Sequence, residues 1–217
     1  LWSSVLEAAG DLSGSANGAL FVFNEAAPIR GRFSDASPRS AEALKDVRPL
    51  FDKFLGSDSW KIFPGVMRMY EIQPARFVQV EDFMTPEEIA NDPQRIAARS
   101  VGIGVNLCTA VPLPTGELVT IVFQRWLKDA GYDQAAIERV DALRPHFARA
   151  GMMAARLRLE QARAAVETLE TIGLAAAVLS APGRVMTANA LLEEMRTTFI
   201  AAAHGRIALA HPAANAL

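Results

Sequence analysis

Few residues in this sequence have the type and spacing that catalysis or metal binding requires. The three histidines, His146, His204 and His211, have no Cys, Asp or Glu at a metal-ligand spacing. Cys108 stands in an apolar, β-rich run, where a buried thiol is the ordinary expectation. No serine stands in a nucleophile elbow. We therefore expect no enzyme activity, no metal site and no cofactor.

Glycines and arginines offer two further kinds of binding chemistry. Gly102 and Gly104 in "VGIGVN" lack the third glycine and the strand, turn and helix of a dinucleotide-binding loop, so we expect no phosphate site there. Three arginines could hold a ligand carboxylate through paired hydrogen bonds, namely Arg68, Arg76 and Arg99. Solvated surface is the alternative explanation for each arginine.

Helices that would position these residues are indicated by caps, prolines and apolar spacing. Short helices are expected over residues 2–9 and 61–70, and Ser37 with Pro38 should begin a helix that runs to about residue 55. Thr85 is expected to cap a further helix, which should break or restart at Asp92 before a proline.

Strands are indicated by runs of β-branched and aromatic residues between turn signals. A hairpin is expected over residues 18–35 and a short strand over 77–80. The runs 102–112 and 117–126, joined by "PLPTGE", should form two central antiparallel strands. The order of helices and strands predicts an α+β fold with helices packed on an antiparallel sheet.

Composition limits the possible partners. The chain has 217 residues, 22 Lys and Arg against 24 Asp and Glu, and a formal net charge of −2, whereas a domain that grips DNA by itself usually carries a basic excess. A single cysteine fits a reducing compartment, and neither a membrane span nor a signal peptide is evident. We expect a soluble, cytoplasmic protein whose natural chain begins before Leu1.

A long helix is expected over residues 133–172, capped by Asp133 and stopped by Gly173; Pro145 should kink it or mark where its domain-bound part ends. Its second half carries an apolar stripe that continues past the point where a sheet could cover it. We expect a helix from a second subunit to bury that stripe in a homodimer; a helix packed only within its own chain is the alternative. The stripe consists of Met152, Ala155, Leu159, Ala162, Val166 and Leu169.

The segment after this helix reads as a hairpin followed by a helix. "LAAAVLS" and "RVMTAN" are the expected strands, "APG" is the turn, and Asn189 should cap the helix that begins with "ALLEEM". This pattern, the stretch "GRVMTANALLEEM" above all, resembles the start of a PAS domain. About 45 residues are too few for a whole PAS domain, so we expect a partial PAS-like domain over residues 173–217.

The whole layout resembles the N-terminal sensory region of bacterial LuxR-type helix-turn-helix regulators. The resemblance rests on "DSWKIFP", "PEEIANDPQ", "LRPHFARA" and the PAS-like end. It implies a GAF-like sensory domain at residues 1–132, a signalling and dimerisation helix at 133–172, and a partial PAS-like domain. It also implies a DNA-binding helix-turn-helix, which these residues lack.

A GAF-like domain encloses a cavity between its sheet and its helices, so the resemblance implies a small-molecule ligand. The side chains able to line that cavity are Phe21, Phe23, Trp60, Phe63, Met67, Tyr70, Leu107 and Phe123. Plain core packing is the alternative for the same residues.

Three functions remain open at this point. The chain could be the ligand-sensing region of a transcription regulator. It could be the sensory region of a histidine kinase or of a cyclic-dinucleotide enzyme, since similar domain strings precede those outputs. It could also be a GAF-like domain that serves only for dimerisation.

Overall fold

The computed structural model describes residues 1–24, 27–55, 63–180, 183–195, 198–202 and 205–211. The chain divides into two compact units, Leu1–Gly151 and Met152–Leu217. Helices and antiparallel strands make up both units, which confirms the predicted α+β class. No helix in the described part of the chain is both long and apolar enough to cross a membrane.

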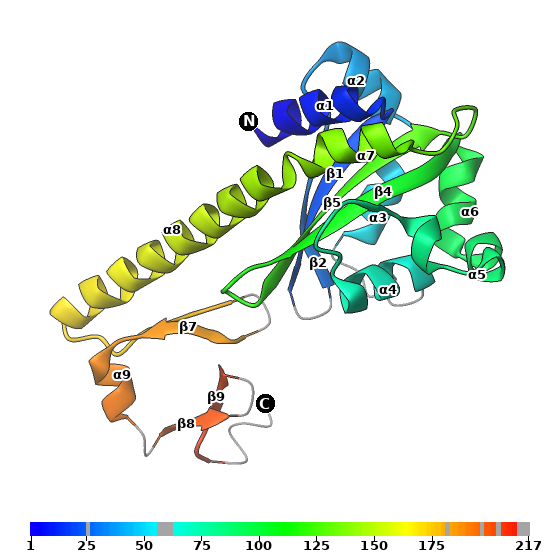
Figure 1. Ribbon diagram of the computed structural model, residues 1–217. Helices are drawn as coiled ribbons and strands as arrows, with labels where there is room; N and C mark the ends of the chain where they lie inside the picture. Colours follow the sequence, from blue (N-terminus) through cyan, green and yellow to red (C-terminus); the bar gives the residue numbers. More distant parts are fainter. Residues whose placement is uncertain (25–26, 56–62, 181–182, 196–197, 203–204, 212–217) are drawn as a thin grey trace. The chain divides into compact units, whose positions relative to one another are not determined.

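The first unit is built on an antiparallel sheet of five strands in the order β2-β1-β5-β4-β3 (Figure 1). The strands are β1 (Asn17–Asn24), β2 (Ala27–Phe33), β3 (Val78–Gln79), β4 (Ile103–Pro112) and β5 (Glu117–Trp126). The predicted hairpins correspond to β1 with β2 and to β4 with β5. Pairing of β1 with β5 then joins the two hairpins into one sheet.

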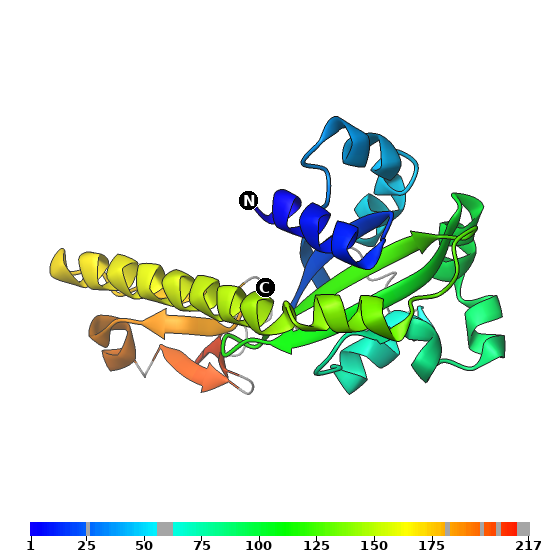
Figure 2. The ribbon, with the colours of Figure 1, turned by 45° about the horizontal axis from the view of Figure 1, so that its top comes forward.

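Helices cover both faces of this sheet. Helices α1 (Trp2–Ser13) and α7 (Gln134–Asp141) lie side by side in Figures 1 and 2. Buried residues of α3 (Arg48–Phe54), α4 (Pro64–Ile72) and α6 (Pro93–Ser100) pack with residues of β1 and β4 in one apolar cluster. The remaining short helices are α2 (Pro38–Leu44), η2 (Val80–Phe83) and α5 (Pro86–Asn91).

Local capping explains where these helices begin. The side chains of Ser37, Thr85 and Asp133 each accept a hydrogen bond from a backbone N–H in the first turn of α2, α5 and α7, as predicted. Asp92 ends α5 and caps α6, which confirms the expected restart. The single helix expected over 37–55 is wrong, because α2 ends at Leu44 and α3 begins at Arg48, with a proline in its first turn.

The helix expected over residues 133–172 is divided into two. Helix α7 ends at Asp141 and α8 (Arg144–Thr171) begins three residues later, with Pro145 in its first turn. Proline lacks the N–H that a continuous helix would need there. Gly173 follows α8 with a φ of 76°, which fits its predicted role as the stop.

The second unit contains the last part of α8, two hairpins and a short helix. Strands β6 (Ala177–Leu179) and β7 (Val185–Ala188) form the predicted hairpin, and Asn189 caps α9 (Ala190–Glu194). A second pair, β8 (Phe199–Ala202) with β9 (Arg206–Leu209), follows.

Candidate ligand-binding site

The residues predicted to line one cavity lie on two different faces of the sheet. Phe21 and Phe23 belong to the cluster that α3, α4 and α6 cover, and Phe63, Met67 and Tyr70 pack against that cluster. Trp60 lies outside the described residues. The eight predicted residues therefore do not form one site.

Leu107 and Phe123 lie on the opposite face, which corrects the prediction for these two residues. They are register partners in β4 and β5, next to Cys108 and Val122 of the apolar cluster, and side chains alternate between faces along a strand. The ring of Phe123 packs against Phe77 at a centroid distance of 5.7 Å. It also lies 3.9 Å from the position that a Cβ would take at Gly10 in α1.

Aromatic packing fills much of the face that carries Phe21. The rings of Phe21 and Phe51 lie 5.4 Å apart, those of Phe33 and Phe51 5.0 Å, and those of Phe23 and Tyr70 6.1 Å. Such spacing is typical of a packed aromatic core. On this part of the face, the core explanation accounts for the predicted residues.

Beside this aromatic core lies a group of buried polar side chains that the sequence analysis missed. Arg95, Asn106, Thr120 and Gln124 are 2%, 6%, 0% and 5% exposed. Gln124 Nε2 donates to Asn106 Oδ1 at 3.1 Å. Gln124 Oε1, Thr120 Oγ1 and two guanidinium nitrogens of Arg95, Nε and Nη1, have no hydrogen-bond partner in the described structure. Buried polar atoms without partners are rare and costly.

Arg95 is the charged member of this group. It comes from the first turn of α6 and forms an ion pair with Glu81. Burial, and to a smaller extent the like charge of Arg99, lowers the pKa of Arg95 to about 10. The side chain is therefore still a cation at neutral pH, with two donors directed at no acceptor.

Two adjoining spaces are open to a ligand at this place. One, of about 40 Å³, is lined by Arg95, Asn106, Thr120 and Gln124 together with apolar residues. The other, of about 240 Å³, is mainly apolar. Gln124 and Phe51 line both spaces. The arrangement combines a polar space with an adjoining apolar space, which is the ordinary chemistry of a small-molecule site.

The three arginines singled out in the sequence do not line this place. Arg68 forms an ion pair with Glu88 at the first turn of α5, and Arg76 and Arg99 are exposed. Arg95 lies one helical turn before Arg99 in α6, and only Arg95 is buried. The only sequence signal for Arg95 is its phase with Ala98, since these two residues form the buried face of α6.

Asp92 fixes the helices around the site. Its Oδ1 accepts from Gln94 N at 2.8 Å and caps α6, while its Oδ2 accepts from Gly65 N at 3.2 Å in α4. This carboxylate is fully buried. One side chain therefore sets the start of α6, and with it the position of Arg95, relative to α4.

No catalytic chemistry is evident at this site. Burial raises the pKa of the Cys108 thiol to about 12, so the sulfur is protonated at neutral pH, as the sequence led us to expect of a buried cysteine. The described residues contain no group of three or more His, Cys, Asp or Glu that could hold a metal ion.

The predicted stripe on α8 is partly covered within the chain itself. Ala155, Ala162 and Val166 are 2%, 7% and 2% exposed, so their burial needs no second subunit. Leu159 and Leu169 are half-buried, and Met152 is exposed. Met153 and Leu157, which were not predicted, are more exposed than any of the six, at 66% and 60%.

Solved structures with a similar fold include the VqsR ligand-binding domain from Pseudomonas aeruginosa, with 15% sequence identity and a TM-score of 0.48 over 68% of this chain and 81% of that one. A GAF domain/HD domain protein from Geobacter sulfurreducens has 16% identity and a TM-score of 0.37, over 67% of this chain and 93% of that one. Escherichia coli SdiA has 12% identity and a TM-score of 0.36, over 68% and 60%.

VqsR and SdiA are LuxR-type regulators, the family that the sequence resembles. No protein-family model and no curated protein matches the sequence. Since all three TM-scores lie below 0.5, these likenesses carry no argument about what the chain binds.

Proposed function

We propose that this chain is the sensory region of a bacterial LuxR-type transcription regulator, and that its first unit binds a small molecule between the sheet and helices α3, α4 and α6. One observation carries the binding proposal. Arg95 is a buried cation with two unpartnered donors, beside the unpartnered oxygens of Gln124 and Thr120. A ligand that satisfies these atoms removes the cost of leaving them buried and unpaired.

The ligand class follows from the lining. Arg95 Nη2 is paired with Glu81, and the unpartnered Nε and Nη1 point to different sides of the guanidinium, so each can donate one charge-assisted hydrogen bond to a carboxylate oxygen. The neighbouring apolar space of about 240 Å³ suits a hydrocarbon part. We infer an amphipathic carboxylic acid, with its carboxylate at Arg95 and its chain toward Phe63.

The output of the sensor lies outside this chain. In this proposal, residues 1–132 sense the ligand, residues 133–172 relay the signal in a cytoplasmic homodimer, and residues 173–217 begin a PAS-like domain. DNA is bound by a helix-turn-helix domain that these 217 residues do not include. The chain acts by binding, not by catalysis.

Exposed apolar residues on α8 are the proposed contact between subunits. Met152, Met153 and Leu157 are 46%, 66% and 60% exposed, whereas Ala155, Ala162 and Val166 are already covered. Met153→Lys with Leu157→Lys should convert dimers to monomers in light scattering. Leu127→Lys, at an exposed site in the first unit, is the matched control. If the unmodified chain is already a monomer in light scattering, the proposed relay through a homodimer is wrong.

The binding proposal is tested by calorimetry with octanoate and decanoate. We expect both acids to bind and to raise the melting temperature, and methyl octanoate to bind at least about tenfold more weakly because it lacks the charge. Arg95→Met should abolish the preference for the acid, while Arg99→Met, one turn along the same helix, should not.

The same experiment addresses the second candidate, a domain that serves only for dimerisation. The small volume of the polar space, about 40 Å³, favours that candidate. It is supported if neither acid binds. If Arg95→Met binds octanoate as tightly as the unmodified chain, the acid binds elsewhere and the site at Arg95 is wrong.

A further inference from the structure

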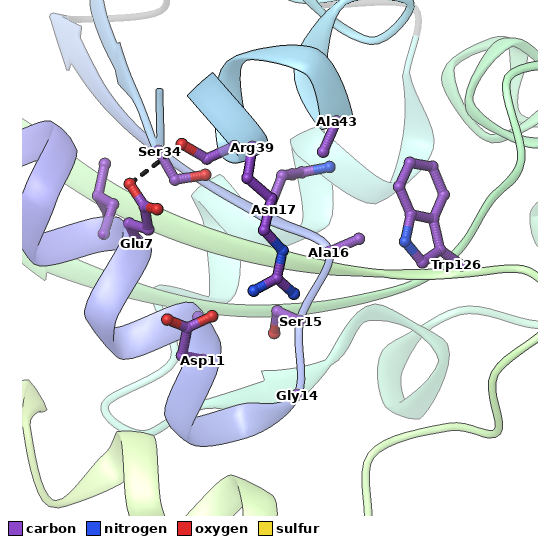
Figure 3. A pocket seen from close by; sticks show the side chains of 13 residues that line it. Glu7, Asp11, Gly14, Ser15, Ala16, Asn17, Ser34, Arg39, Ala43 and Trp126 are labelled. Atoms are coloured by element: carbon purple, nitrogen blue, oxygen red, sulfur yellow. Dashed lines mark hydrogen bonds between the residues drawn. The ribbon is translucent and has the colours of Figure 1, made fainter. Parts of the chain in front are cut away.

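A second and larger hollow, of about 370 Å³, lies in the first unit where α1 and α2 meet the start of β1 (Figure 3). Leu6, Gly10 and Gly14 of α1 and its C-terminal cap form one wall, and Trp126 at the end of β5 forms another. Its volume falls in the range of small-molecule sites. The hollow shares no lining residue with the two spaces near Arg95.

One charged residue that lines this hollow, Glu7, already has hydrogen-bond partners in α2. Glu7 of α1 accepts from Ser37 Oγ at 2.5 Å and from Ser40 Oγ at 3.0 Å, and these two serines form the first turn of α2. The hydrogen bond from Ser37 is the main reason that the pKa of Glu7 lies below its ordinary value of 4.5. Glu7 therefore joins α1 to α2 and is not available to a ligand.

The hydroxyl groups of the lining are also engaged. Ser34 Oγ accepts from Gly18 N at 2.8 Å. Ser15 Oγ is bonded to Ser13 Oγ at 2.6 Å and to the hydroxyl of Tyr132 at 2.9 Å. These hydroxyl groups are therefore already engaged within the chain and are not free to bind a ligand.

Three polar groups of the lining have no partner among the described residues. The side chain of Asn17 is 3% exposed, and both its Nδ2 and its Oδ1 are unpaired. The side chains of Asp11 in α1 and Arg39 in α2 are exposed and form neither an ion pair nor a hydrogen bond in the described structure. Figure 3 shows the guanidinium group of Arg39 projecting into the hollow, with Asp11 on the opposite wall.

We propose that this hollow is a binding site for a small zwitterion, an α-amino acid, in which Arg39 holds the carboxylate, Asp11 holds the ammonium group, and the Asn17 amide donates to the first and accepts from the second. Asp11 and Arg39 line one space but do not pair with each other, so a molecule with both charges can bridge them. The exposed charges alone would contribute little. The Asn17 amide, whose two polar atoms are shielded from solvent in the structure, turns into the hollow to supply the specific contact, because binding satisfies two atoms that are otherwise unpaired.

Other ligand classes fit these groups less well. One free carboxylate and one amide are too few ligands for a divalent cation. One free guanidinium is too little charge for a nucleotide, whose phosphates would face Glu7 and Asp11. A zwitterion matches the free groups in number and in sign.

The proposal is tested by calorimetry on the full chain with glycine and L-alanine as probes. We expect millimolar or tighter binding of both, and at least about tenfold weaker binding of propionate and of ethylamine, each of which has one of the two charges. Arg39→Met and Asp11→Asn should each raise the dissociation constant for glycine at least about tenfold. Arg76→Met, an exposed arginine outside the hollow, is the matched control.

Folding of each variant is checked by its melting temperature without ligand, which should be unchanged because both side chains are exposed and unpaired. Failure of both amino acids to bind overturns the proposal. It is equally overturned if propionate binds as tightly as glycine, or if Arg39→Met and Asp11→Asn bind glycine like the unmodified chain.

Discussion

Asn17 of β1 and Gln124 of β5 are direct register partners, and both carry a buried amide oxygen without a hydrogen-bond partner. Gln124 is also the register partner of Asn106 in β4, to which it donates. Three buried amides thus cross three adjacent strands on one face of the sheet. Asn17, at one end, lines the hollow between α1 and α2, and Asn106, at the other, lines the space near Arg95.

The amides of Asn17, Gln124 and Asn106 predict opposite effects on the free energy of unfolding for two similar substitutions. Asn17→Leu removes two unpaired buried atoms and should raise the free energy of unfolding by about 1–2 kcal/mol, while abolishing glycine binding. Asn106→Leu deprives the Gln124 amide of its acceptor and should lower that free energy by about 1–3 kcal/mol. Urea unfolding measures both. A loss of stability in Asn17→Leu would show that the amide has a partner in solution.

The contact between Glu7 and the serines of α2 predicts a pH dependence. The pKa of Glu7 is lowered, so its contribution to stability is complete above pH 4.5 and is lost as the pH falls through the lower value in the folded state. Glu7→Gln should therefore flatten the fall of the melting temperature below pH 4.5. Glu87→Gln, at an exposed site, is the control, and equal acid sensitivity in both variants would contradict the prediction.

Gly104 has a structural role that explains one of the two glycines in "VGIGVN". A Cβ at this position would lie 2.8 Å from the backbone Cα of Leu127, closer than two such atoms can approach. Gly104→Ala should destabilise the first unit by about 1–3 kcal/mol, because the backbone must shift. Gly10→Ala is the control: a Cβ there meets nothing nearer than 3.8 Å, and alanine favours the helix. Thermal unfolding distinguishes the two variants.

Local signals in the sequence are sufficient to place most of the elements. Asp133 was identified as the start of a helix because its short side chain can cap one, and Asp92 as a break or restart because it precedes a proline. The strands around "PLPTGE" were identified because apolar runs and a turn are local properties. Such features depend on a few neighbouring residues.

The composition of the site depends on contacts that the sequence does not contain. Alternation along a strand separates two faces but does not say which face a given residue takes, so Leu107 and Phe123 were grouped with Phe21. Arg95 could not be identified in advance, since its burial is set by the position of α6 against the sheet. A charged residue in an isolated helix is expected to face solvent.

The side chain of Asn189 forms hydrogen bonds to four backbone groups of the second unit. Its Oδ1 accepts from Ala176 N at 3.0 Å and from Leu192 N at 3.1 Å, and its Nδ2 donates to the carbonyls of Leu174 at 2.8 Å and Val166 at 3.1 Å. The side chain is 3% exposed, so water cannot replace these bonds. Asn189→Ala should therefore cost more than a simple helix cap, about 2–4 kcal/mol, because it leaves several buried groups unpaired.

Hydrogen exchange measures this effect segment by segment. We expect Asn189→Ala to accelerate exchange in β6, β7 and α9 and to leave β4 and β5 of the first unit unchanged, because the four bonds all lie within Met152–Leu217. Asn189→Asp is the matched control: it keeps the acceptor oxygen for α9 but lacks the two donors, so an intermediate effect is expected. If Asn189→Ala exchanges like the unmodified chain, the second unit is held together by something other than this side chain.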